Sequence, residues 1–255
     1  MNQLLIDAGN TRLKWTTLRG ARLGRTHALD WNARSMERVA SAVLRTRASR
    51  VLVCSVAGAA FERALRRAAR AAGKRAPQFV RSTRRAAGVR NGYLETWRLG
   101  ADRWVAMLGA RAIYSGRSLC VVDVGTALTL DLLDAQGRHR GGLIVPGPTL
   151  MVDSLLSDTA GIRRRAGRNV RATRRPAALF GRSTRAGLLA GSAMACAALI
   201  ERALREARRE LAGRPLLLLS GGGAAQVAPL LSVAHRRVDG LVLHGLALLA
   251  GLESR

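Results

Sequence analysis

Short apolar runs and longer amphipathic segments alternate along most of the chain. The runs are a few residues long and are bounded by glycine, asparagine or proline, which is typical of buried strands. The predicted strands lie at 4–15 as a hairpin, 50–56, 79–80, 118–133 as a second hairpin, 141–148 and 215–220.

The longer segments repeat alanine, leucine and arginine at helical spacing, so that one face is apolar. They predict helices at 35–47, 61–72, 102–114, 149–156, 183–211 and 241–252. The polar segment 88–100 is predicted to be a loop. Strands alternating with helices of this length indicate an α/β fold.

Two strand–turn–strand segments repeat the same Asp-x-Gly pattern half a chain apart. Asp7-Ala-Gly-Asn-Thr and Asp123-Val-Gly-Thr-Ala align at an offset of 116 residues, and each follows an apolar strand. One such match is weak, because Asp-Gly turns are common. Two in the same context predict duplicated α/β domains, at residues 1–115 and 116–255, that face each other across a cleft.

Composition narrows the class of protein. The 255 residues are 48% apolar and 23% charged, which excludes disordered and fibrous chains. Cys54, Cys120 and Cys196 lie far apart without a CxxC motif, which excludes a disulfide scaffold and a zinc finger and fits a reducing cytoplasm. The first residues do not resemble a signal peptide, and the apolar stretch 186–200 is too short to span a membrane.

The net charge of +27 is carried almost entirely by arginine, since Lys14 and Lys74 are the only lysines. Such a charge attracts nucleic acid, but the arginines are spread over predicted helices as solvated faces, and coding bias produces the same composition. The densest stretch, residues 161–175, lacks aromatic residues that stack on bases. It is either a region that steers anions or a mobile basic loop.

The two hairpins suit phosphate chemistry. A glycine such as Gly9 lets backbone N–H groups converge on an anion, and a carboxylate such as Asp7 just before it can hold the metal that accompanies a nucleotide. Asn10, Thr11 and Thr126 add short donors, and Lys14 is a compact positive charge. The alternative is an ordinary surface hairpin, which does not explain the second copy.

Two further sites have both a chemical and a structural interpretation. Ser220-Gly-Gly-Gly follows an apolar strand and either admits a base or ribose or forms a tight turn. Asp102, at a predicted loop-to-helix junction, is either a general base or the helix N-cap, and local sequence favours the cap. P-loop and Rossmann motifs do not occur.

Taken in order, these motifs resemble the type III pantothenate kinases of the acetate and sugar kinase, heat-shock ATPase and actin superfamily. The motifs are 7–14 (DAGNTRLK), 91–93 (NGY), 100–103 (GADR), 123–131 (DVGTALTLD), 141–147 (GGLIVPG) and 220–222 (SGG). Ser220 stands where a threonine is often found. The resemblance implies two ribonuclease-H-like α/β domains with an ATP cleft between them, a homodimer, and ATP-dependent phosphorylation of pantothenate in the first step of coenzyme A synthesis.

The resemblance also implies residue roles. ATP with Mg²⁺ would be bound by Asp7, Gly9, Asn10, Thr11, Arg12, Lys14, Thr126, Gly221 and Gly222, with Asp7 near the magnesium. Pantothenate would contact Tyr93, Gly100, Ala101, Asp102, Arg103 and, from the partner copy, Thr184, with Asp102 accepting the proton. Asp123 would hold a monovalent cation, K⁺ or NH₄⁺.

The sequence leaves two alternatives open. The first is a transcriptional accessory or nucleic-acid-binding protein on the same fold, although no helix-turn-helix pattern is present. The second is another small-molecule kinase or a phosphatase of the superfamily, since fold does not determine substrate.

Overall fold

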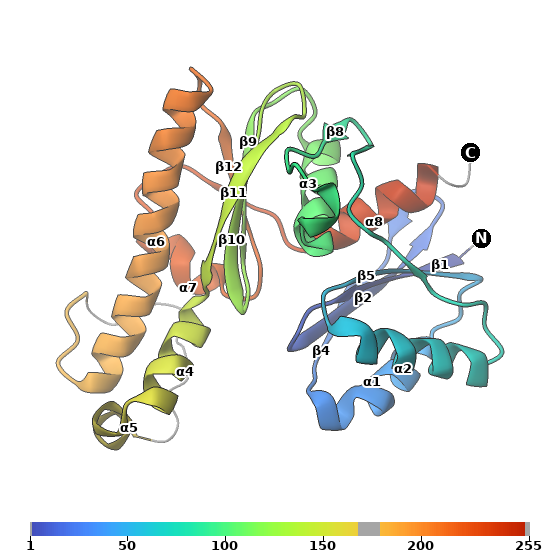
Figure 1. The fold of residues 1–255 in the computed structure, drawn as a ribbon, viewed down its shortest axis with the longest axis horizontal. Helices are drawn as coiled ribbons and strands as arrows, with labels where there is room; N and C mark the ends of the chain where they lie inside the picture. The colour runs from blue at the N-terminus through green and yellow to red at the C-terminus, as the bar shows by residue number, and fades with distance from the viewer. Residues whose placement is uncertain (1, 168–178, 253–255) are drawn as a thin grey trace. The chain divides into compact units, whose positions relative to one another are not determined.

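A computed structural model describes residues 2–167 and 179–252. The chain forms two compact units (Figure 1). Unit 1 consists of the N-terminal segment up to Gly116, residues 136–139 and the C-terminal segment from Gly240. Unit 2 consists of residues 117–135 and the segment from 140 to 239.

Unit 1 is built on a mixed sheet with the strand order β3-β2-β1-β5-β6, and β4 also pairs with β2. Its strands are β1 (Asn2–Ala8), β2 (Arg12–Arg19), β3 (Arg22–Leu23), β4 (His27–Asp30), β5 (Arg50–Ser55) and β6 (Gln78–Phe79). β1 runs antiparallel to β2 and parallel to β5. A two-stranded ribbon, β7 (Arg85–Ala86) with β8 (Val89–Arg90), lies outside this sheet.

Helices cover both faces of this sheet. Such cover is needed because β1 and β5 carry apolar side chains on both faces of the sheet. Leu4, Ile6 and Val53 point to the core under α1 and α2, which also contains Phe61. α3 and α8 pack on the other face (Figure 1). The helices are η1 (Ala33–Ser35), α1 (Met36–Leu44), α2 (Gly58–Ala71), η2 (Thr96–Arg98), α3 (Ala101–Ile113) and α8 (Leu241–Leu252).

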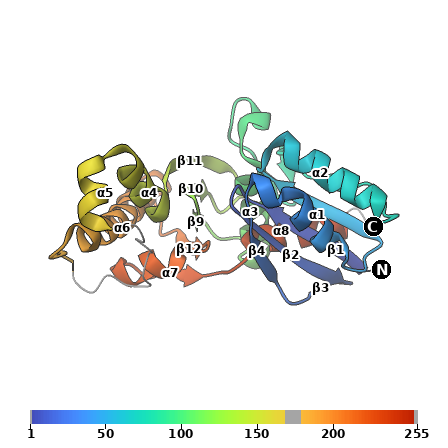
Figure 2. The ribbon, with the colours of Figure 1, turned by 90° about the horizontal axis from the view of Figure 1, so that it is seen from below.

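Unit 2 repeats the plan with the strand order β11-β10-β9-β12-β13. Its strands are β9 (Leu119–Val124), β10 (Ala127–Leu133), β11 (His139–Pro146), β12 (Leu216–Ser220) and β13 (Arg236–Arg237). Its helices are α4 (Pro148–Asp158), α5 (Ala160–Ala166), α6 (Thr184–Glu210), α7 (Ala224–Val227) and η3 (Ala228–Leu230). α4 and α6 lie on the same side of the sheet (Figure 2), where Val122 and Ile200 share one core.

The predicted α/β fold and its duplication are confirmed by the pairing of the strands. In each unit a first strand pairs antiparallel with the next strand in the chain and parallel with a later one, as β1 does with β2 and β5 and β9 does with β10 and β12. The turns differ in length, because four residues separate Ala8 from its register partner Leu13, whereas three separate Val124 from Leu128. The repeat is therefore one of topology, with independent turns.

The units divide the chain differently from the predicted boundaries at its C-terminal end. The division after Gly116 lies one residue from the predicted one, but α8 belongs to unit 1. Glycines let α8 approach α3 closely, since a Cβ on Gly245 would lie 2.0 Å from the carbonyl oxygen of Val105 and one on Gly109 would lie 2.2 Å from that of Leu241. α8 joins unit 1 through contacts between segments that are distant in sequence. A local sequence pattern does not reveal such contacts.

Among the described residues, α6 is the helix whose length and composition would allow it to cross a membrane. It extends well beyond the predicted apolar stretch 186–200. Cys196, Ala197, Ile200 and Leu204 on this helix belong to the core of unit 2, so its apolar face packs against protein. α6 is thus a core helix of unit 2.

Two loop predictions need correction. Residues 161–166 of the basic stretch are helical, as part of α5, which contradicts the loop alternative for this part, while Arg168, Arg171, Arg174 and Arg175 lie outside the described residues. The predicted loop 88–100 contains β8 and the single turn η2. Two-residue strands and one-turn helices carry no periodicity that a sequence pattern could reveal.

Candidate functional site

The turn between β1 and β2 presents polar side chains on a fixed backbone. The Gly9 N–H donates to the Arg12 carbonyl at 3.0 Å, and Trp31 holds the turn from outside, its indole N–H donating to the Gly9 carbonyl at 3.0 Å and its backbone N–H to the Thr11 carbonyl at 2.9 Å. Asn10, Thr11 and Arg12 are exposed beyond this support. Sequence reasoning missed Trp31, because a contact between residues 9 and 31 leaves no local pattern.

Asp7 and Lys14 lie at the base of this turn as register partners on β1 and β2, and both are half-buried. Arg12 forms an exposed ion pair with Asp30, at 3.6 Å between Nε and Oδ1. The turn thus carries a carboxylate, two cations and short polar donors within eight residues. This combination suits a metal-bound phosphate chain.

Asp102 lies in the first turn of α3 but does not cap it, so the cap interpretation is wrong. The N-cap residue is Gly100, and Asp102 Oδ1 instead accepts a hydrogen bond from the Arg103 backbone N–H at 2.8 Å. A Cβ at position 100 would lie 2.7 Å from Asp102 Oδ1, so glycine makes room for the carboxylate. Ala101, between them, is the first residue of the helix.

The charges of Asp7 and Asp102 both affect the pKa of the same buried thiol, that of Cys54. Burial raises the pKa of Cys54 well above its ordinary value, and the charges of Asp7 and then Asp102 raise it further. Cys54 is the register partner of Asp7 on β5. Two carboxylates predicted for one reaction, far apart in sequence, therefore lie near one point of unit 1, where the partial positive charge of the α3 N-terminus favours anions.

Tyr93 and Arg103 form the second group of unit 1. Arg103 Nη1 donates to the Tyr93 hydroxyl at 2.9 Å, and Arg103 is buried. Asn91 holds the loop around Tyr93 by accepting from the Tyr93 backbone N–H at 2.9 Å and donating to the Thr83 and Thr96 carbonyls. Because Arg103 directly follows Asp102 in the sequence, the Tyr93–Arg103 pair adjoins the group that contains Asp7 and Asp102.

In unit 2, the second hairpin and the glycine cluster come together. Asp123 and Ser220 are register partners on the parallel strands β9 and β12. Gly221, with φ of +95°, lies so close to β9 that a Cβ there would be 2.4 Å from the Val124 carbonyl oxygen. Gly222 follows as an exposed residue. A side chain at position 221 would thus both strain the backbone and collide with it.

Thr126 is tied to the start of α4. The Gly147 N–H donates to the Thr126 carbonyl at 2.8 Å, and a Cβ on Gly147 would lie 2.1 Å from the Gly125 carbonyl oxygen. The end of the 141–147 motif therefore braces the turn that carries Thr126. The sequence showed Gly147 as part of a motif but not this contact.

Thr184 is the first residue of α6, where the Ser183 hydroxyl accepts from the Ala186 N–H at 3.1 Å and caps the helix. Its expected role requires a second copy of the chain. It stays a prediction.

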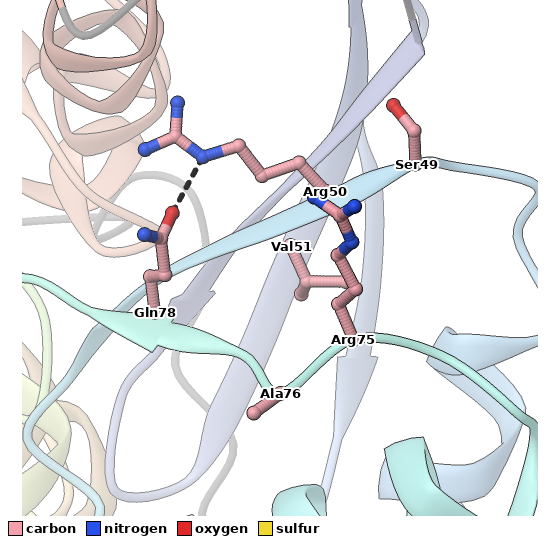
Figure 3. Close-up of a pocket in the computed structure, with 6 residues that line it drawn as sticks. All are labelled: Ser49, Arg50, Val51, Arg75, Ala76 and Gln78. Carbon is pink, nitrogen blue, oxygen red and sulfur yellow. Dashed lines mark hydrogen bonds between the residues drawn. The ribbon is translucent and has the colours of Figure 1, made fainter.

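One cavity of unit 1 lies away from these groups. It has a volume of about 400 Å³ and is lined by Ser49, Arg50, Val51, Arg75, Ala76 and Gln78 (Figure 3). Arg50 opens β5 and donates to the Gln78 side chain, whereas Asp7 pairs with Cys54 near the other end of that strand. The cavity contains none of the predicted site residues.

The carboxylates fit a magnesium ion that arrives with its nucleotide. Within residues 2–167 and 179–252, no three His, Cys, Asp or Glu side chains are grouped so as to hold a metal ion. Magnesium in kinases is usually held by one or two carboxylates together with water and the phosphates themselves. Asp7 with Asp102 nearby satisfies that requirement.

Comparison with solved structures supports the fold. MreB 5 of Spiroplasma citri, solved with bound AMPPNP, matches 99% of this chain and 97% of its own with a TM-score of 0.52 at 11% identity. At this identity the likeness shows the fold alone, an actin-like pair of ribonuclease-H-like domains. This agrees with the predicted α/β fold of two such domains.

Comparison of the sequence is more specific. The family model of type III pantothenate kinase matches residues 3–206. The type III pantothenate kinase of Aromatoleum aromaticum is 40% identical over 248 residues, covering 97% of both chains, and that of Herminiimonas arsenicoxydans is 39% identical over 251 residues, covering 95% of both. These matches lend no support to the nucleic-acid-binding alternative. The chain therefore belongs to the type III pantothenate kinase family and is an ATP-dependent kinase that phosphorylates pantothenate for coenzyme A biosynthesis.

Proposed function

We propose that Asp102 accepts the proton of the primary hydroxyl of pantothenate while the Asp7 hairpin holds ATP. The observation that supports this proposal is that Cys54 is the register partner of Asp7 and that the charges of both Asp7 and Asp102 raise the pKa of its thiol, so the two carboxylates lie near the same group. Phosphoryl transfer depends on alignment and charge neutralisation more than on covalent chemistry, so proximity of these two groups is what the reaction requires.

The β1–β2 turn binds the phosphates. Gly9 and the exposed side chains of Asn10, Thr11 and Arg12 offer hydrogen bonds, and Lys14 supplies positive charge from the paired strand. Asp7 holds the magnesium ion, which when bound neutralises charge on the phosphate oxygens. The contacts of Trp31 keep the turn in one conformation, so little ordering remains to be done on binding.

The loop 91–103 binds pantothenate. Tyr93 and Arg103 supply a hydroxyl and a guanidinium that are already hydrogen-bonded to each other. The guanidinium can pair with the carboxylate of the substrate. Gly100 and Ala101 present backbone without bulky side chains at the helix start, beside Asp102. The Arg103 N–H donates to Asp102 Oδ1 and so orients the carboxylate that takes the proton.

Unit 2 contributes a monovalent cation site and further nucleotide contacts. Asp123, beside Ser220, offers oxygen ligands to K⁺ or NH₄⁺. Thr126 donates to phosphate from the braced turn, while Gly221, packed against β9, and the exposed Gly222 offer backbone groups to the nucleotide. The working enzyme is a cytoplasmic homodimer in which Thr184 of each copy reaches the pantothenate of the other.

The decisive measurement is pantothenate-dependent release of ADP by the purified protein, with and without K⁺. We expect release that requires pantothenate, ATP and Mg²⁺ and that K⁺ stimulates. A panel of other small alcohols and acids should not replace pantothenate. Release that ignores pantothenate but follows another substrate would refute the substrate assignment.

A further inference from the structure

The tip of the β10–β11 hairpin forms part of unit 1. Residues 136–139 belong to this unit, although their neighbours in sequence belong to unit 2. The Arg90 backbone N–H donates to the Gly137 carbonyl at 2.9 Å, and the backbones of Arg90 and Arg138 form an isolated parallel β-bridge. A Cβ on Gly92 would lie 2.0 Å from the His139 carbonyl oxygen, so the tip lies in direct contact with the loop that precedes Tyr93.

His139 places its ring on Tyr93 from this tip. The ring centroids are 5.8 Å apart with planes 15° from parallel, and His139 is only 3% exposed. The Arg103 guanidinium lies on the same tyrosine, 5.7 Å from the ring centroid, and bonds to its hydroxyl. The Tyr93 ring therefore contacts both an imidazole and the guanidinium of the residue that follows Asp102.

We propose that His139 is a positioning residue for pantothenate, whose ring fixes the plane of Tyr93 and thereby the direction of the Tyr93 hydroxyl and the Arg103 guanidinium. This inference rests on the proposed roles of Tyr93 and Arg103 in binding. A tyrosine without a stacked neighbour can turn about its side-chain bonds, and binding must then order it. His139 removes that cost before the substrate arrives.

The test compares His139→Leu, which keeps apolar volume but has no ring, with His139→Phe, which keeps the ring. We expect His139→Leu to raise the KM for pantothenate roughly 3- to 10-fold, the size of an aromatic pair, with kcat and the KM for ATP unchanged. His139→Phe should restore the KM to within about twofold. The half-buried His235 of unit 2 provides the control, since His235→Ala should leave both KM values unchanged.

Two results would overturn the proposal. One is a folded His139→Leu protein with an unchanged KM for pantothenate, and the other is a KM in His139→Phe as high as in His139→Leu. Thermal melts of each variant establish that the protein is folded. If His139→Leu does not fold, His139→Met takes its place as the apolar variant without a ring, and a raised KM in folded His139→Phe still contradicts a role for the stacked ring.

A double-mutant cycle with Tyr93→Leu separates this proposal from the assignment of the pantothenate site. In the Tyr93→Leu background, His139→Leu should change the KM by less than about twofold, because its effect passes through Tyr93. If Tyr93→Leu itself leaves the KM unchanged, the proposed pantothenate site is wrong. If Tyr93→Leu raises the KM and His139 contributes the same increment in both backgrounds, only the positioning role is wrong.

Discussion

Asp123 lies beside Ser220 on parallel strands, as Asp7 lies beside Cys54 in the other unit. The neighbouring groups differ, a hydroxyl in unit 2 and a thiol in unit 1 whose raised pKa keeps it protonated and neutral. A hydroxyl oxygen is a good ligand for a hard cation, whereas a neutral thiol is a poor one. The duplicated aspartates therefore have different surroundings, which agrees with the different ions proposed for them.

Asp123→Asn tests the cation site. The amide keeps the shape but loses the charge, so the K⁺ concentration for half-maximal stimulation should rise roughly 10- to 100-fold, the range for disturbing a metal site. Titration of ADP release with KCl at constant ionic strength measures it. Asp153→Asn, an exposed change on α4, should leave the K⁺ response unchanged, and an equal shift in both variants would contradict the assignment.

Asp102→Asn tests the general base. Asparagine can still accept the hydrogen bond from the Arg103 N–H, so the fold should be retained. Loss of the base should lower kcat by roughly two to four orders of magnitude, with a smaller change in the KM for pantothenate. Near-normal kcat in this variant would show that another group takes the proton.

Gly245→Ala tests the contact between α8 and α3. A methyl group there would be forced against the Val105 carbonyl, and overpacking of this kind costs about 3 kcal/mol, or a fall in Tm of about 6–12 °C for a chain of this size. Gly251→Ala on the same helix meets no atom within 4 Å and should leave the protein as stable or slightly more so. Similar Tm values for the two variants would refute the close approach.

The buried thiols predict a loss of stability at alkaline pH. Burial raises the pKa of Cys120 to about 12, with the charge of Asp131 adding to it, and burial raises that of Cys196 to about 11, from an ordinary value of 9.0. An unfolded chain releases these protons above pH 9 while the folded one keeps them. Stability is therefore fully present below pH 9 and falls above it, by about 1.4 kcal/mol for each thiol at pH 10.

Urea unfolding at pH 8 and pH 10 measures this effect. The sequence contains only two lysines and two tyrosines that titrate in the same range, so the thiols contribute a large share. A Cys120→Ala/Cys196→Ala variant should lose about 3 kcal/mol less than its parent between the two pH values. An equal loss in both proteins would contradict the raised pKa values.

Most long elements could be predicted from the sequence because each carries its own pattern. The helix over 61–72 was recognisable from its apolar face and from Gly73, which adopts φ of +64° after α2. The helix over 241–252 agrees with α8 at both ends. The strands β3, β4 and β13 were missed, since two to four residues show no periodicity and depend on their neighbours for pairing.

The candidate site was predictable where it is local and not where it depends on tertiary contact. The two Asp-Gly turns could be read directly. Trp31 and His139 could not, because each supports a site residue from a distant segment. The cap interpretation of Asp102 failed because the N-cap is Gly100, two residues before Asp102.

The return of α8 to unit 1 affects how the chain folds during synthesis. The ribosome completes residues 1–116 well before it completes α8. Until then Leu5 and Leu52, on the side of the sheet that α8 and α3 cover, lack part of their apolar cover. Unit 1 must therefore wait for α8, and a nascent chain would need protection from aggregation until α8 has been synthesised.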